Sequence, residues 1–286
     1  MSKSSRHITI SLCSFLFCLT LGVGIYGVYI EPSRLEVRHV WINDREMGQL
    51  LQKKVILQIS DVHLRAIGAN ETKLLKTIEA LQPDLVFLTG DYVKWNGAYE
   101  RALDFLAKVK AKDGVWAVMG DYDYSNSRKS CLFCHEPNSG RPTKRYDIKF
   151  LRNSLDKINT PAGPMWIAGL DIEAVGGSFS EESLSFLTGK EPAIILSHSP
   201  LTFDLIDDNQ NVLMLAGDTH GGQVPLPSWL WRFLGYEKNA RYEQGWFKKG
   251  KKRMYVTRGV GTSHFPIRLF RRPEITVFHF QVPKTN

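Results

Sequence analysis

One stretch decides the fold of this chain: Gly217-Asp218-Thr219-His220-Gly221-Gly222-Gln223. The apolar run Val212 to Ala216 leads into it, and two side chains able to bind a metal, Asp218 and His220, follow at alternate positions. The glycines behind them allow the backbone to turn sharply. On its own, the stretch predicts a strand that ends in a tight turn carrying an acid and a histidine.

Four other apolar runs end in a similar way. They stop at Asp61-Val62-His63, Gly90-Asp91, Gly120-Asp121-Tyr122-Asp123 and Ser197-His198. Helical spacing, as in Thr72 to Leu81, separates several of the runs. Strands that alternate with helices indicate an α/β domain, and ligands of such domains collect just beyond the carboxyl ends of the strands. We therefore expect one site that all five runs share.

The residues directly at these ends supply more groups than one metal ion needs, four carboxylates and three imidazoles: Asp61, Asp91, Asp121, Asp218, His63, His198 and His220. Two ions about 3.5–4 Å apart that share one carboxylate would use all seven groups. Such a pair can hold a bridging hydroxide and bind the oxygens of a phosphoryl group. The alternative is that these acids cap helices or form turns, which explains one of them more easily than the whole set.

The five blocks resemble those of the calcineurin-like metallophosphoesterases in order and spacing. The tail, with Tyr255 to Ser263, Pro266-Ile267-Arg268 and Pro273-Glu274-Ile275, resembles the membrane-associated bacterial branch of that family. The resemblance covers roughly residues 50 to 282. It implies an α/β fold in which two mixed β-sheets form a sandwich flanked by helices, with the metals at one edge.

The resemblance also implies a role for individual residues. Position by position, the first metal would be bound by Asp61, His63 and His220, the second by Asp121, His198 and Asp218, with Asp91 bridging the two. Mixed nitrogen and oxygen ligands suit Mn, Fe or Zn, and the carboxylate-rich second half favours Mn or Mg, so we expect two divalent ions with Mn as the first choice. Arg258 would bind substrate. Asp91 and Tyr122 would be the catalytic residues.

Three positions depart from the family pattern. Asp121 stands where Asn is usual and Asp218 where His is usual, which makes the second site more anionic. Tyr122 stands where most members have the His thought to protonate the leaving group; Tyr can donate a hydrogen bond but is a poorer acid at neutral pH. A nucleotide phosphate, as a good leaving group, tolerates that change. A catalytically weakened metal-binding scaffold is the competing hypothesis.

The N-terminal segment Ile8 to Ile30 is uncharged and strongly apolar. At about 1.5 Å per residue, it is long enough to cross a bilayer core of about 30 Å. We expect an uncleaved anchor; a cleaved signal peptide is the alternative, although the stretch is long for one and no clear A-x-A site follows. The predicted division is a tail at 1–7, a transmembrane helix at 8–30, a linker at 31–49 and the phosphoesterase domain at 50–282.

A second membrane contact is predicted from Trp229, Trp231 and Phe233, which are interleaved with basic residues. Aromatic rings favour the bilayer interface, and lysines and arginines favour anionic headgroups. The alternative is a partly packed connection beside a solvated basic turn. The net charge of +8 suits an anionic partner, but the chain carries no recognisable nucleic-acid-binding motif, so we expect no nucleic acid.

These features predict a single-pass protein of the bacterial inner membrane that acts on an amphiphilic phosphorylated substrate. A known membrane-bound member of the branch hydrolyses UDP-2,3-diacylglucosamine to lipid X and UMP, a step of lipid A biosynthesis. The resemblance implies that substrate first, with another lipid or nucleotide phosphodiester as the alternative. That chemistry would place the domain on the cytoplasmic side. The segment Cys131 to His135 matches a haem-attachment pattern, but a disulfide, a metal clip or free thiols explain it better in this setting.

Overall fold

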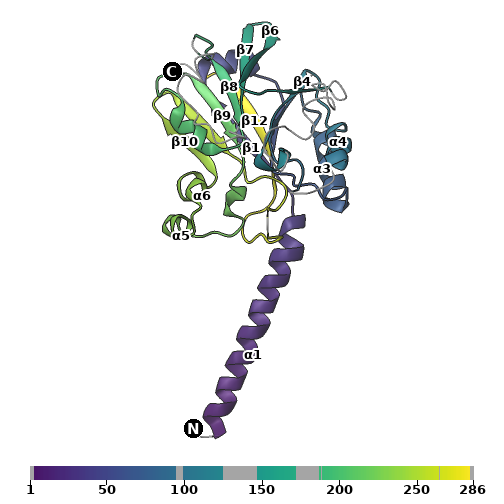
Figure 1. Ribbon diagram of the computed structural model, residues 1–286, viewed down its shortest axis with the longest axis vertical. Helices are drawn as coiled ribbons and strands as arrows, with labels where there is room; N and C mark the ends of the chain where they lie inside the picture. Colours follow the sequence, from purple (N-terminus) through teal and green to yellow (C-terminus); the bar gives the residue numbers. More distant parts are fainter. Residues whose placement is uncertain are drawn as a thin grey trace.

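The computed structural model describes residues 3–94, 99–124, 147–171, 187, 189–263 and 265–283. Within these ranges, two six-stranded mixed sheets pack against each other, and a long N-terminal helix projects from the domain (Figure 1). The predicted sandwich of two mixed sheets with flanking helices is confirmed.

The first sheet has the order β1-β12-β2-β3-β4-β5. Its central strands are parallel, and β12 runs antiparallel to β2 but parallel to β1. The strands are β1 (Glu36–Asn43), β2 (Ile56–Ile59), β3 (Leu85–Thr89), β4 (Gly114–Val118), β5 (Ile148–Phe150) and β12 (Glu274–Gln281).

The second sheet has the order β10-β11-β9-β8-β7-β6. Its inner strands are parallel, and an antiparallel strand closes each edge. The strands are β6 (Ser154–Thr160), β7 (Gly163–Leu170), β8 (Ala193–Ser197), β9 (Val212–Ala216), β10 (Gly245–Lys249) and β11 (Lys252–Val256).

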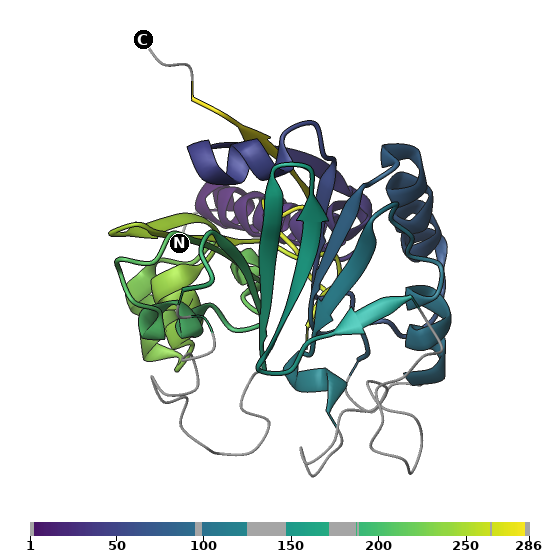
Figure 2. The same cartoon turned by 90° about the horizontal axis from the view of Figure 1, so that it is seen from above.

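Helices cover the outer faces of the sheets. On the first sheet they are α3 and α4, seen beyond β4 in Figure 1 and along the edge of the molecule in Figure 2. The remaining helices are short and stand between strands. The bounds are α2 (Arg45–Leu51), α3 (Ala69–Leu81), α4 (Tyr99–Leu106), η3 (Asp121–Asp123), η5 (Pro200–Leu205), η6 (His220–Gly222), α5 (Ser228–Phe233) and α6 (Glu237–Tyr242).

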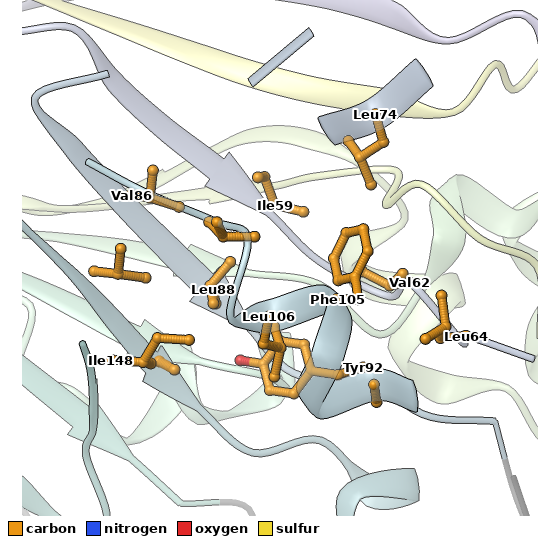
Figure 3. Packing of buried hydrophobic residues seen from close by; sticks show 14 of the residues in the cluster. Ile59, Val62, Leu64, Leu74, Val86, Leu88, Tyr92, Phe105, Leu106 and Ile148 are labelled. Atoms are coloured by element: carbon orange, nitrogen blue, oxygen red, sulfur yellow. The ribbon is translucent and has the colours of Figure 1, made fainter. Parts of the chain in front are cut away.

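Three apolar clusters hold these layers together. One fills the space between the two sheets, where Phe87 and Trp116 of the first sheet meet side chains such as Leu196 of the second. Another lies between the first sheet and its helices and includes Tyr92 and Phe105 (Figure 3). The third backs the second sheet. Strands buried on both faces explain why the sequence shows continuous apolar runs in place of alternation.

The segment 31–49 is not a linker, contrary to the prediction. Residues Glu36–Asn43 form β1, which pairs along its whole length with β12, and α2 begins at Arg45. Val40 and Ile42 point into the core between the sheets, whereas Trp41 between them is 58% exposed. The charged residues of this segment hid an alternating pattern that is typical of an edge strand.

The N-terminal helix α1 spans Lys3–Ile25 and continues into a π-helical turn, Tyr26–Ile30, and a 3₁₀ turn, Glu31–Ser33. The part from Ser11 to Ser33 is long and apolar enough to cross a membrane, and it is almost entirely outside the folded domain. A signal sequence meets the same criteria of length and composition.

The role of β1 can be tested by two serine substitutions on the same strand. Ile42→Ser should lower the free energy of unfolding by roughly 3 kcal/mol, because it removes a buried aliphatic side chain from the core. Trp41→Ser, on the exposed face, should cost far less. Denaturant unfolding of the detergent-solubilised chain measures both. Equal, small effects would mean that the segment is a linker after all.

Candidate metal centre

The ends of five strands come together between the two sheets. Gln58 of β2 donates from Nε2 to the carbonyl of Ala216 at the end of β9 (3.0 Å), and the Gly217 N–H donates to the carbonyl of His198 (3.0 Å). The first bond joins the first sheet to the second, and the other joins the ends of β8 and β9, which are neighbours in the second sheet. The side chains that follow β2, β3, β8 and β9 therefore share one pocket.

The first group of ligands consists of Asp61, His63 and His220, all buried. The Nε2 atoms of the two histidines lie 3.0 Å apart, and His220 Nε2 is 3.6 Å from Asp61 Oδ1. Ligand atoms bound to one ion at about 2.1 Å stand about this far from each other. The spacing therefore fits a single cation held by both imidazoles and a carboxylate.

The second group consists of Asp61, Asp91 and His198. Asp91 Oδ2 is 3.4 Å from His198 Nε2 and also 3.4 Å from His63 Nε2, so its carboxylate lies between the two groups. Asp218 Oδ1 is 4.0 Å from His198 Nε2. Asp91 thus has the position that a bridging ligand needs, as its predicted role requires.

His198 is oriented as a metal ligand. Its Nδ1 donates to the carbonyl of Thr89 (2.7 Å), which leaves Nε2, a buried atom with no hydrogen-bond partner in the described part of the chain, as the atom that a metal would bind in place of a proton. A second hydrogen bond of this kind is the usual way of fixing a ligating imidazole. The residues present therefore fit a divalent ion.

The electrostatics of the pocket also call for a cation. Burial raises the pKa of Asp61 to about 7, so this carboxylate needs a positive neighbour to stay ionised at neutral pH. Burial disfavours a charged His198, yet Asp91, Asp218 and Asp61 outweigh it and raise the pKa of that imidazole well above its ordinary value. For Asp91, burial is likewise outweighed by His198 and His63, which lower its pKa.

The backbone at the ligands is strained. The φ angles are positive at Asp61 (55°), His63 (45°), Asp91 (57°), Asp218 (74°) and His220 (53°). A non-glycine residue in the left-handed region costs on the order of 1–3 kcal/mol, and such residues cluster at active sites. The fold therefore holds these side chains in place at a cost that the apolar cores must offset.

Two glycines leave room for the carboxylates. A Cβ on Gly217 would lie 2.0 Å from Ser60 Oγ and 2.5 Å from Asp61 Oδ2, and a Cβ on Gly120 would lie 2.0 Å from Asp91 Oδ1. Any larger residue would displace the ligands. The glycine that precedes the aspartate in each of these two Gly-Asp blocks therefore lets the backbone pack closely against a candidate metal ligand.

Two polar residues outside the ligand set hold it in position. Asp123 is fully buried and accepts the backbone N–H groups of Asp91 (2.7 Å) and Tyr92 (2.8 Å). Arg268, also fully buried, donates to the carbonyls of Gly261 (2.5 Å) and His220 (3.4 Å). Burial lowers the pKa of Arg268 to about 10. The sequence placed both residues in family-like blocks but carried no signal of these contacts.

The sequence also missed Lys238 as a member of the site. Its Nζ lies 2.5 Å from Asp218 Oδ2 and 4.0 Å from Asp121 Oδ2. Burial opposes the charge of Lys238, but Asp218 and Asp121 raise its pKa, so the ammonium persists. Both acids replace neutral residues of the family pattern, and the lysine balances part of the added negative charge. Asp121 is not in either ligand group, and the structure connects it to the centre through this lysine.

Tyr122 lies at the centre, as predicted. Its ring meets that of His63 edge-on at 4.7 Å between centroids, and its backbone N–H donates to Asp91 Oδ1 (3.0 Å). Burial raises the pKa of Tyr122 to about 12, with Asp91 and Asp121 adding to the effect. The hydroxyl is therefore a hydrogen-bond donor that seldom gives up its proton.

Arg258, the predicted substrate ligand, is held inside the domain. Its Nε donates to Glu274 Oε2 (2.6 Å) and its Nη2 to Glu36 Oε2 (3.0 Å). The side chain is 9% exposed. The structure thus gives Arg258 a role in joining the tail to β1 and β12, and its contact with substrate stays a prediction.

The predicted membrane residues divide into two kinds. Trp229 and Phe233 of α5 are 67% and 82% exposed. Trp231 is 9% exposed, and its ring packs so closely on Gly222 that a Cβ there would lie 2.8 Å from it. The membrane contact predicted for Trp231 is therefore wrong, because helical spacing turns this residue toward the metal-binding turn. Cys131, Cys134 and His135 lie outside the described residues.

A family model described as Calcineurin-like phosphoesterase matches residues 54–222. The chain belongs to this family. Its metal centre is accordingly that of a metallophosphoesterase, with Asp61, His63, Asp91, His198 and His220 as candidate ligands.

Several curated proteins are similar over most of the chain. An uncharacterised metallophosphoesterase of Bacillus subtilis, YkuE, is 29% identical over 91% of this chain and 91% of its own length. The phosphodiesterase YaeI of Escherichia coli is 31% identical over 68% of this chain and 70% of its length. A UDP-2,3-diacylglucosamine pyrophosphatase, LpxG of Chlamydia trachomatis, is 26% identical over 90% of this chain and 92% of its length.

The close packing at Gly217 gives a direct test of the ligand geometry. Gly217→Ala should weaken Mn²⁺ binding by about fivefold to a hundredfold, on the order of the 1–3 kcal/mol that overpacking costs, because the added methyl group overlaps Asp61. Gly22→Ala, in open space on α1, is the matched control. Free Mn²⁺ measured by electron paramagnetic resonance reports both affinities. Unchanged binding in Gly217→Ala would mean that Asp61 is not a ligand.

Lys238 yields a prediction of opposite sign. Lys238→Met should bind Mn²⁺ about tenfold more tightly, since it removes a positive charge beside Asp218. Lys238→Arg keeps the charge and should bind as the unaltered chain does. The same resonance titration applies. If Lys238→Met binds Mn²⁺ no better than Lys238→Arg, then Asp218 contributes nothing to the field at the metals.

Proposed function

We propose that this protein is a membrane-anchored phosphoesterase that uses two divalent ions to hydrolyse a phosphate ester or pyrophosphate. The observation that carries the proposal is the position of Asp91, whose Oδ2 lies 3.4 Å from both His63 and His198. One carboxylate between two imidazole-lined positions is the arrangement that two ions sharing a ligand require. The family membership supports the same chemistry.

Two ions would be held by Asp61, His63 and His220 on one side and by His198 and Asp218 on the other, with Asp91 between them. When bound, such ions activate water and neutralise charge at phosphorus. Tyr122 donates a hydrogen bond toward the leaving oxygen, and Lys238 supplies positive charge at the Asp218 side. Mn²⁺ is the proposed metal because this set combines three carboxylates with three imidazoles, and oxygen ligands from carboxylates suit Mn²⁺.

The proposed substrate is UDP-2,3-diacylglucosamine, cleaved at the pyrophosphate to lipid X and UMP. Its support is the similarity to proteins named as pyrophosphatases of that compound, together with an apolar helix that could hold the domain at a bilayer. UMP is a stable leaving group and needs little help from a general acid, which suits the high pKa of Tyr122.

The proposed location is the bacterial inner membrane, with α1 as a single span and the domain on the cytoplasmic side. In Figure 1, α5 lies on the side of the domain from which α1 projects. The exposed Trp229 and Phe233 of α5 would therefore face lipid headgroups. No nucleic acid is expected as a partner.

A catalytically weakened metal-binding scaffold is the second candidate. The observation in its favour is the pair of departures at the second site, where Lys238 engages Asp218 and Tyr122 is a weak acid. The two candidates differ in turnover and agree in metal binding.

Hydrolysis of bis(p-nitrophenyl) phosphate with added Mn²⁺ separates them. We expect metal-dependent turnover that falls at least a hundredfold in Asp91→Ala, because that change removes the shared ligand. Asp208→Asn, an acid outside the site, should retain full activity. Absence of turnover with any divalent metal would establish the scaffold. Release of UMP from UDP-2,3-diacylglucosamine then tests the substrate; activity on the diester alone would exclude it.

A further inference from the structure

A cavity of about 270 Å³ lies beside the metal centre, and its walls connect the centre to the membrane helix. His63, a candidate ligand, lines it at one end. Val28 and Pro32, at the end of the apolar N-terminal span, line it at the other. The cavity therefore extends from the end of the apolar span to a candidate metal ligand.

The helix end is fixed against the domain. The Arg268 N–H donates to the carbonyl of Gly27 (2.9 Å), and a Cβ on Gly27 would stand only 3.0 Å from side-chain carbons of Ile267 and Leu269. The Arg268 guanidinium also donates to the carbonyl of His220 (3.4 Å). The distance from the anchor to the metal ligands is thus set by direct contacts, and Figure 1 shows α1 leaving the domain beside the yellow C-terminal segment.

The cavity wall is amphiphilic. Lys73 and Arg65 bring positive charge to it, and Lys73 Nζ donates to the carbonyl of Ser33 (3.1 Å), which ties α3 to the end of the anchor. The acid on the wall, Glu71, accepts the N–H of Gly68 (2.9 Å) at the start of α3. The rest of the wall is largely apolar, with Leu35, Val62, Leu74, Val260, Pro266 and Pro273.

We propose that this cavity binds the apolar chain of a membrane-resident phosphoester, so that its phosphoryl group lies at His63 and the neighbouring ligands. The inference rests on the phosphoesterase function proposed above and adds the place where the alkyl or acyl chain of such an ester binds. Each methylene group of a bound chain that moves from water onto an apolar wall increases the affinity of the protein for that chain. Arg65 and Lys73 suit the anionic groups that accompany such a chain.

The test is a series of p-nitrophenyl alkyl phosphates with methyl, butyl and hexyl chains, given with Mn²⁺ to the full chain in lipid nanodiscs. Water adds to phosphorus, the bond to the aryl oxygen breaks, and p-nitrophenol and an alkyl phosphate are released. We expect kcat/KM to rise up to about threefold to fourfold for each added methylene, mainly through KM. As a test that does not involve turnover, hexyl phosphate should inhibit the enzyme more strongly than methyl phosphate does.

Variants connect the preference to the cavity. Leu35→Trp and Val28→Phe should each fill it and flatten the dependence on chain length, while leaving turnover of the methyl ester unchanged. Ile67→Trp, on a different surface beside α3, is the matched control and should keep the dependence.

The outcomes separate the inference from the function on which it rests. Turnover that does not depend on chain length, or a dependence that survives in both cavity variants, would overturn the cavity assignment and leave the phosphoesterase intact. No turnover of any ester, including the methyl ester and bis(p-nitrophenyl) phosphate, would overturn the proposed function and the inference with it.

Discussion

The structure depends on holding buried carboxylates close together. Asp61 and Asp91 are almost completely removed from solvent, and both stand within reach of the same imidazoles. Without a cation, burial favours the protonated form of Asp61, and left-handed backbone at five ligand positions adds strain. The apolar layers on both faces of each sheet offset these costs. The active centre is thus stable as a metal-binding site first, and its chemistry follows from that.

A second constraint joins the centre to the end of the apolar N-terminal helix. Arg268 is buried without a carboxylate partner at hydrogen-bonding distance in the described chain, and its guanidinium instead gathers carbonyl groups from the tail and from His220. Its own backbone N–H donates to the carbonyl of Gly27, at the end of that helix. One residue therefore links the end of the apolar N-terminal helix, the tail and the metal-binding turn.

Much of the fold could be predicted from sequence because its strands are short, buried and followed by chemically distinctive residues. The runs before Asp61, Asp91, Asp121, His198 and Asp218 are strands as predicted, and four of these five residues reach the centre directly. Asp121 reaches it only through a lysine. The predictions that failed are those that depend on packing. The β1 segment was predicted to be a linker because it contains charged residues, and only alternate residues of the strand face the core.

The environment of a single side chain also depends on packing and could not be predicted from the sequence. Trp231 and Phe233 are two residues apart on α5, but one packs on Gly222 and the other is exposed, a difference that residue type does not reveal. Lys238 was visible only as one of many basic residues, and its pairing with Asp218 arises because α6 lies against the turn, where Asn239 Nδ2 donates to the carbonyl of Thr219 (2.9 Å). Arg258 was in a recognisable block, yet its contacts with the buried Glu274 and the partly exposed Glu36 decide its position.

The most direct measurement is an anomalous difference map, at the manganese edge, from crystals grown with Mn²⁺. Two peaks about 3.5–4 Å apart are predicted, one between His63 and His220 and one beside His198, with the Asp91 carboxylate between them. A single peak, or peaks away from these side chains, would contradict the account of a two-metal phosphoesterase.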